Sequence, residues 1–212
     1  MSISIHKLRF ILTGFVTGLT LLASAQIHAE YFGLPNGRSA DLSSMPAKSV
    51  EAGFVTGDLA DVSYQGFGIR FNALVSPESM FYFDINQTEI EDADGTILGI
   101  GFFYQLEGLL QNTDTAIKGA FHNGKVKQDG FRDLKGKTIS VEALFSGKKM
   151  GESNLRWYGN VGIHKFDFDN YDETEIGFGG GVFMPTSFGE FFAGADMIDE
   201  LTFGAGVRYF LQ

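Results

Sequence analysis

The sequence predicts an all-β protein, an antiparallel up-and-down β-barrel of ten strands that crosses a membrane, with eight strands as the second interpretation. Ten segments alternate apolar residues with small or polar ones, which is the period of a β-strand. Phenylalanine (22) and glycine (28) are abundant and proline (4) is scarce, as is typical of short half-buried strands. After the N-terminal segment, no stretch approaches the ~18 consecutive apolar residues of a transmembrane helix.

Residues 1–29 have the three regions of a secretory signal peptide. Lys7 and Arg9 provide the positive region, an uncharged apolar run follows, and small residues come next at Ala23-Ser24-Ala25 and again at Ala29. Cleavage after either alanine fits the pattern. A retained membrane anchor is the alternative, although the apolar run is short for a spanning helix. We therefore expect export through the inner membrane.

The remaining chain divides into a short lead-in and one barrel domain. Residues 30–47 contain Pro35, Asn36-Gly37 and Pro46 and show no alternation, so we expect a periplasmic lead-in. The barrel then covers residues 48–212. A mature length of about 183 residues suits one domain.

Composition excludes several functions. Without Lys7 and Arg9 the chain has 14 basic and 26 acidic residues, a net charge near −12. This balance argues against nucleic acid and against a polybasic membrane contact. The absence of cysteine excludes disulfides, thiolate metal sites and a thiol nucleophile. We expect no cofactor and no metal site.

The clearest predicted strand places Phe67 and Ile69 on one face and Arg70 on the other. The ten predicted strands are 48–58, 63–75, 80–89, 97–106, 115–122, 138–146, 154–166, 173–184, 189–198 and 200–211. Segments 115–122 and 138–146 are marginal for the ~9–11 residues of a membrane-crossing strand, which leaves eight strands as the alternative.

The connections between these strands differ in length. Residues 76–79 and 185–188 read as tight turns, whereas 89–96, 123–137 and 167–172 read as longer charged loops. Short periplasmic turns and longer extracellular loops are typical of outer-membrane barrels. An even strand number then places both chain ends in the periplasm.

If the apolar faces contact lipid, the opposite faces place one long polar residue per strand in the lumen. Closing the barrel would bring Arg208 beside Glu51, and interior glycines would leave room for such long side chains. We therefore predict a largely closed lumen with an ion-pair network, because buried charges are tolerated when paired. Its predicted members are Glu51, Arg70, Asp84, Lys118, Glu142, Arg156, Glu175, Asp196 and Arg208.

A soluble periplasmic β-barrel that binds an apolar ligand is the alternative, with the two faces exchanged. Alternation alone fits both interpretations. Aromatic residues near the segment ends favour the membrane, where they would form girdles. These residues are Phe81, Tyr82, Phe83, Trp157, Phe191, Phe192 and Tyr209.

The signal peptide and the final segment, 201–212, carry a resemblance to the small outer-membrane β-barrel proteins of Gram-negative bacteria. Such proteins end in an alternating strand whose last residue is aromatic and is recognised by the barrel-assembly machinery. Here Phe210 is followed by Leu211 and Gln212, a departure from that pattern. The resemblance implies outer-membrane localisation. It implies outer-membrane lipid, lipopolysaccharide and the assembly machinery as partners, and it leaves the oligomeric state open.

Two histidines of the mature chain are the weak catalytic candidates. His122 and His164 fall at predicted extracellular strand ends, and His164 precedes Asp167. The omptin proteases and the lipid A deacylases, two families of similar barrels, place histidine near the outer rim with acidic or serine partners. A rim histidine paired with a loop carboxylate is the simpler interpretation, since a general base needs partners within hydrogen-bond reach.

We predict that the protein is not an enzyme and has a structural or surface-interaction role in the cell envelope. A surface-facing protease or lipid A hydrolase and a narrow channel are the alternatives. One charged segment suggests a contact: its basic residues could bind lipopolysaccharide phosphates or form a solvated hairpin. They are Lys125, Lys127, Arg132, Lys135 and Lys137.

Overall fold

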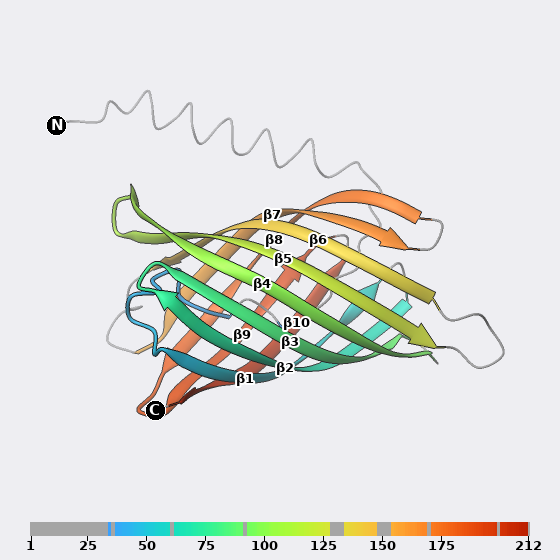
Figure 1. Cartoon of the computed structure of the whole chain (residues 1–212), viewed down its shortest axis with the longest axis horizontal. Helices are drawn as coiled ribbons and strands as arrows, with labels where there is room; N and C mark the ends of the chain where they lie inside the picture. Colours follow the sequence, from blue (N-terminus) through green and yellow to red (C-terminus); the bar gives the residue numbers. More distant parts are fainter. Residues whose placement is uncertain are drawn as a thin grey trace, which may run out of the picture.

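The computed structural model of the chain describes residues 34, 37–59, 62–90, 93–127, 134–147, 154–168, 171–198 and 200–211. The predicted signal peptide, 1–29, lies outside these residues. The described residues form ten strands (Figure 1). They are β1 (Lys48–Leu59), β2 (Val62–Ser76), β3 (Ser79–Ile90), β4 (Ala93–Leu110), β5 (Thr113–Lys127), β6 (Leu134–Gly147), β7 (Arg156–Phe168), β8 (Tyr171–Pro185), β9 (Gly189–Met197) and β10 (Leu201–Leu211).

Each strand pairs antiparallel with its neighbours in the chain, and β10 pairs with β1 to close the barrel. The predicted fold class, with ten strands, is confirmed. We call the end where β1 begins and β10 finishes the terminal end, and the opposite end the far end. In Figure 1 the terminal end is on the left and the far end on the right. Among the described residues no helix is long and apolar enough to cross a membrane.

The strands are longer at the far end than alternation predicts. β4 begins at Ala93, β5 runs to Lys127, and β6 begins at Leu134. Most of the predicted long loops therefore belongs to strands. Beyond the apolar region both faces of a strand become polar, so the hydropathy pattern ends although the backbone ladder continues. The tight turns after β2 and β8 are confirmed, and the second is closed by the Thr186 N–H, which donates to the Gly189 carbonyl (2.7 Å).

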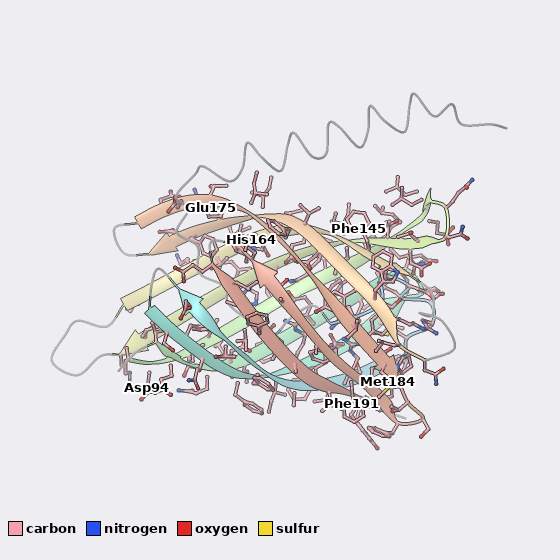
Figure 2. The ribbon with its side chains drawn as sticks, turned by 180° about the vertical axis from the view of Figure 1, so that it is seen from behind. Asp94, Phe145, His164, Glu175, Met184 and Phe191 are labelled. Atoms are coloured by element: carbon pink, nitrogen blue, oxygen red, sulfur yellow. The ribbon has the colours of Figure 1, made fainter. Side chains whose placement is uncertain are left out.

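The outer wall carries the apolar side chains. Phe67 is 55% exposed and Val141 58%, and Figure 2 shows Met184 and Phe191 on the outside at the terminal end. The orientation is opposite to that of a soluble barrel, whose apolar face would point inward. Tyr82 and Phe192, which we grouped with the outward aromatic residues, are buried inside instead, because each lies next to an outward residue and strand faces alternate.

Two larger apolar clusters, and a smaller one of Tyr158, Phe183 and Phe192, occupy the inside of the barrel. The cluster at the far end joins Val55, Tyr64, Ile97, Phe166 and Ile198. The cluster at the terminal end consists of Ala40, Leu42, Met80, Tyr82, Phe103, Ala116, Ala120 and Leu144. Charged side chains share the inner wall with these clusters, so the interior is packed with side chains over the described residues.

Ala40 and Leu42 precede the first strand and belong to the segment that we expected in the periplasm. Its described part, Leu34 and residues 37–47, is here called the lumen segment; most of it packs inside the barrel, whereas Ser43, Ser44 and Ala47 are exposed. Leu34, Ala40 and Leu42 are each at most 1% exposed. The lead-in lacks alternation because it is not a strand, and hydropathy therefore gave no sign of where it packs.

Candidate functional site: the charged lumen

Five charged residues on neighbouring strands form one row around the inner wall. Cross-strand partners lie on the same face of a sheet, and here the successive partners are Glu190, Arg208, Glu51, Arg70 and Asp84. The sign of the charge alternates along the row. Each arginine therefore lies between two carboxylates.

Glu51 is the centre of this row. Its Oε1 accepts a hydrogen bond from Arg208 Nε (2.9 Å), and its Oε2 lies 3.6 Å from Arg70 Nη1. Arg70 also donates to Asp84 Oδ2 from Nη2 (3.0 Å), and Arg208 donates to Glu190. Glu51 and Arg208 are completely buried. At this degree of burial, charge-assisted hydrogen bonds replace hydration.

The lumen segment contributes a third arginine to Glu51. Arg38 donates to Glu51 and, from Nη2, to Asn72 Oδ1 (3.0 Å). Its guanidinium carbon lies 4.3 Å from the centroid of the Phe103 ring, in cation–π geometry. Arg38 is completely buried. One carboxylate thus joins three arginines, from β2, from β10 and from the lumen segment.

Backbone groups hold the lumen segment as well. The carbonyls of Leu34 and Gly37 accept from Arg70 and Arg208, at 3.3 and 3.2 Å. The Ala40 N–H donates to Ser146 Oγ (2.8 Å). Further along, the Leu42 N–H donates to Gln105 Oε1 (2.8 Å). A non-strand segment inside a barrel needs such partners because buried backbone groups must be hydrogen-bonded.

A separate ion pair joins β5 and β6, across the barrel from the row on β9, β10, β1, β2 and β3. Lys118 Nζ is 2.6 Å from Glu142 Oε1. Asn160 donates to Glu142 Oε2 (3.3 Å) and to Asp196 Oδ1 (3.2 Å), and so connects β6, β7 and β9. Seven of the nine predicted network residues thus belong to the row or to this second group.

The other two are placed differently. Glu175 is buried on β8 as the cross-strand partner of His164, and Arg156 is half-buried at the start of β7. Two members of the network were missed. Glu190 has the same strand parity as Asp196, so parity could have identified it. Arg38 could not be identified in this way, because no strand pattern surrounds it.

Both histidines are buried in the lumen, not at the rim where we expected them. His122 is 4% exposed, and its Nε2 lies 3.5 Å from Asp84 Oδ1. Gly99 makes room for His122 and Asp84, since a Cβ there would lie 2.1 Å from Asp84 Oδ1 and 2.3 Å from His122 Cδ2. β5 and β7 continue past His122 and His164. The two histidines, which we expected at strand ends, therefore lie inside the barrel.

His164 is 5% exposed and stacks on Phe166, with 6.3 Å between the ring centroids. Phe166 belongs to the far-end apolar cluster. Asp167 is three residues from His164 and exposed on the outer face, because an odd separation reverses the face of a strand. The structure thus does not bring His164 and Asp167 together. Figure 2 shows His164 and Glu175 near the far half of the barrel.

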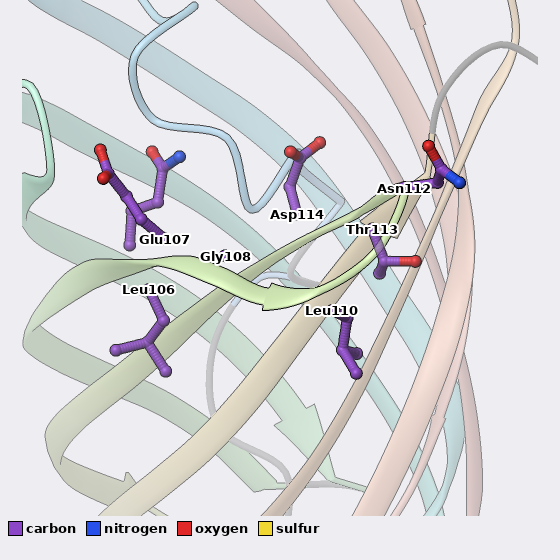
Figure 3. Close-up of a pocket in the computed structure, with 8 residues that line it drawn as sticks. Leu106, Glu107, Gly108, Leu110, Asn112, Thr113 and Asp114 are labelled. Atoms are coloured by element: carbon purple, nitrogen blue, oxygen red, sulfur yellow. The ribbon is translucent and has the colours of Figure 1, made fainter. Parts of the chain in front are cut away.

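A cavity of about 250 Å³ lies at the terminal end, where β4 finishes and β5 begins (Figure 3). A register shift between Leu106 and Leu110 interrupts the regular β4–β5 pairing here, and Gly108 and Asn112 have positive φ angles of 67° and 60°. The cavity is lined by Gln105, Leu106, Glu107, Gly108, Leu110, Asn112, Thr113 and Asp114. Gln105 also holds the lumen segment, so the cavity borders that segment.

No protein-family model matches the chain, and no curated protein matches it. Solved structures of related shape include the β domain of the Bordetella autotransporter Brka, at 10% identity and TM-score 0.48, over 79% of this chain and 100% of that one. A KdgM porin is 6% identical over 77% and 99% of the two chains, with TM-score 0.44. LpxR from Salmonella typhimurium is 7% identical over 71% and 73%, with TM-score 0.43. At these values the likenesses assign no activity to this chain.

Proposed function

We propose that the protein is an outer-membrane barrel, closed by its own lumen segment and charge network, with a structural or surface-interaction role in the envelope. The contact of Arg38 with Glu51 carries this proposal. It joins a segment outside the sheet to the centre of the charged row, and it places a buried cation where a conducting pore would have water.

The outer wall supports the placement in a membrane. Large apolar side chains are exposed on all ten strands. Soluble monomers rarely expose apolar patches of more than a few hundred Å², whereas a membrane barrel presents an apolar band about 25 Å tall. Charged groups are gathered inside, where pairing offsets their desolvation.

Fractionation and gel mobility test this placement. We expect the protein in the outer-membrane fraction, and we expect it to migrate as a compact species on a denaturing gel until it is boiled. The closed ladder resists cold detergent because every strand has two partners. Recovery in the soluble periplasmic extract, with no mobility shift, would contradict the proposal.

Conductance in planar bilayers tests the closed lumen. The wild-type protein is expected to show no stable conductance above background. Arg38→Ala removes a charge-assisted hydrogen bond of about 1.5–3 kcal/mol, so the fraction of molecules with an undocked lumen segment should rise roughly 10- to 100-fold. Glu51 keeps Arg70 and Arg208 in this variant, and the barrel wall should therefore persist.

A tether provides the matched control. Ser39 Oγ and Ser146 Oγ lie 3.2 Å apart, and the chain contains no cysteine. In an Arg38→Ala background, Ser39→Cys with Ser146→Cys should silence conductance when oxidised and restore it when reduced. Steady conductance from the wild-type protein, or from the oxidised tethered variant, would argue for an open channel.

The surroundings of the histidines support a non-enzymatic role. His122 and His164 are buried, and His164 packs under Phe166 at the far end. A substrate approaching from the far end would meet the apolar cluster first. We favour a structural role for both histidines over a surface protease or lipid A hydrolase that uses them.

A further inference from the structure

Three side chains that can react with one another meet on the inner wall of β5, β6 and β7. Lys118 Nζ lies 2.6 Å from Glu142 Oε1, and Asn160 Nδ2 donates to Glu142 Oε2 (3.3 Å). An amine is a nucleophile, a side-chain amide contains an electrophilic carbon, and a carboxylate accepts and donates protons. One carboxylate therefore holds the amine and the amide at its two oxygens.

Strand register brings the three side chains together. Lys118 is the cross-strand partner of Glu142, and Glu142 is the partner of Gly162. Gly162 is two residues from Asn160 and lies on the same face of β7. A Cβ at Gly162 would lie 2.5 Å from Glu142 Cγ. Because residue 162 is a glycine, the Glu142 side chain can extend over β7 and reach Asn160.

This group of side chains is shielded from water. Lys118, Glu142 and Asn160 are at most 8% exposed. On the inner wall of β5, Lys118 lies between Ala116 and Ala120, two members of the apolar cluster at the terminal end. Burial favours the neutral forms of ionisable groups. The proton of the pair can therefore move from the ammonium to the carboxylate and leave a nucleophilic amine.

The Asn160 side chain has one polar atom that this network does not satisfy. Its Nδ2 donates to Glu142 and to Asp196 Oδ1 (3.2 Å), whereas its buried Oδ1 has no hydrogen-bond partner among the described residues. A buried acceptor without a donor is a feature of strained or catalytic sites. The amide is thus held through its nitrogen, the atom that departs when an amide is attacked by an amine.

We propose that Lys118 and Asn160 form an intramolecular isopeptide bond after folding, with Glu142 as the catalytic residue that transfers protons. Glu142 takes one proton from the Lys118 ammonium, and the electron pair of the amine forms a bond to Asn160 Cγ. Glu142 passes this proton to Nδ2, the Cγ–Nδ2 bond breaks with its electron pair on nitrogen, and ammonia leaves. The second proton that the attacking nitrogen loses follows the same route to the departing ammonia. The products are a secondary amide and an ammonium ion, and no oxidant, reductant or water is consumed.

The new bond joins β5 to β7 across β6. The chain has no cysteine and therefore no disulfide, whereas an isopeptide bond is a covalent link that reductants do not break. It closes the loop between residues 118 and 160, and a closed loop lowers the conformational entropy of the unfolded chain.

Mass spectrometry of the full mature protein, denatured after folding, tests the proposal. The wild-type chain is expected to be lighter than its sequence mass by one ammonia, and digestion should release the peptides of Lys118 and Asn160 as one joined species. A succinimide at Asn160 or a cyclised N-terminal glutamine also loses ammonia, so the joined peptide decides. Recovery of the two peptides unjoined from the folded wild-type protein would overturn the proposal without any variant.

Variants assign the chemistry to individual residues. Lys118→Gln and Asn160→Leu should give no joined peptide. General acid–base catalysis contributes about 10²–10⁴-fold, so Glu142→Gln should slow joining after refolding in micelles at least roughly a hundredfold. Lys48→Gln, exposed at the terminal end, is the matched control and should join at the wild-type rate.

Compact migration on an unboiled gel shows which variants have folded. Equal joining rates of folded Glu142→Gln and wild type would exclude Glu142 as the catalytic residue. Loss of ammonia that persists in folded Lys118→Gln would assign this loss to another site. If Glu142→Gln does not fold, the joined peptide of the wild-type protein still decides whether the bond exists.

Discussion

Glu51→Gln should lower the free energy of unfolding by about 3–5 kcal/mol, the cost of removing one partner from a buried ion pair. Arg70 keeps Asp84 and Arg208 keeps Glu190 in this variant. Arg38, however, loses its only charged partner among the described residues and keeps the Asn72 amide oxygen. Urea unfolding in micelles, followed by the fluorescence of Trp157, the single tryptophan, measures the effect.

Asp58→Asn on the same strand is the matched control for Glu51→Gln. Asp58 is exposed near the far end of β1, and neutralising it should change stability by less than about 0.5 kcal/mol. The double variant Glu51→Gln/Arg38→Met should recover part of the loss, because no buried cation is then left uncompensated. Equal stability of Glu51→Gln and wild type would show that the row does not stabilise the barrel.

Val141→Arg should destabilise the inserted barrel by about 2–4 kcal/mol, the cost of an arginine that faces lipid near the middle of the bilayer. Val141 points outward from the middle of β6, and its cross-strand partners Gly119 and Ile163 belong to the same wall. Urea unfolding from vesicles measures this difference, and assembly in the outer membrane should fall with it.

Thr174→Arg is the control for Val141→Arg, because it adds the same side chain to the outer wall at another depth. Thr174 is exposed on β8, two residues beyond Ile176 towards the far end. Near the interface the cost falls to about 0–1 kcal/mol. If both substitutions cost the same, the wall has no depth profile and does not face a bilayer.

The apolar outer wall and the charged inner wall have the same cause, the alternation of side chains along each strand. Strand alternation places every second residue inside, so a wall that suits lipid leaves the charged residues no other place than the lumen. Cross-strand register then decides which charges meet. Arg208 pairs with Glu51 because β10 closes onto β1 in the register that makes them direct partners, and the closure of the barrel thereby completes the row.

The number of strands and their faces were predictable from the sequence. Phe67, Ile69 and Arg70 alternate over enough residues to fix which side chains share a face, since the strand period is two, and the membrane interpretation then predicts that the apolar face points outward. The same parity selected Glu51, Arg70, Asp84 and Arg208 as inward. Strand ends were predicted less well: β4 extends back to Ala93 because hydrogen bonding between strands continues where the apolar pattern has stopped.

The sequence by itself determined the two faces of every strand, because that property depends only on local parity and hydropathy. Tertiary structure alone decided what fills the barrel. Arg38 reaches Glu51 across the lumen, and His122 comes near Asp84 across β4. The first contact depends on a segment without periodicity and the second on the register of β3, β4 and β5; a pattern along one strand contains neither.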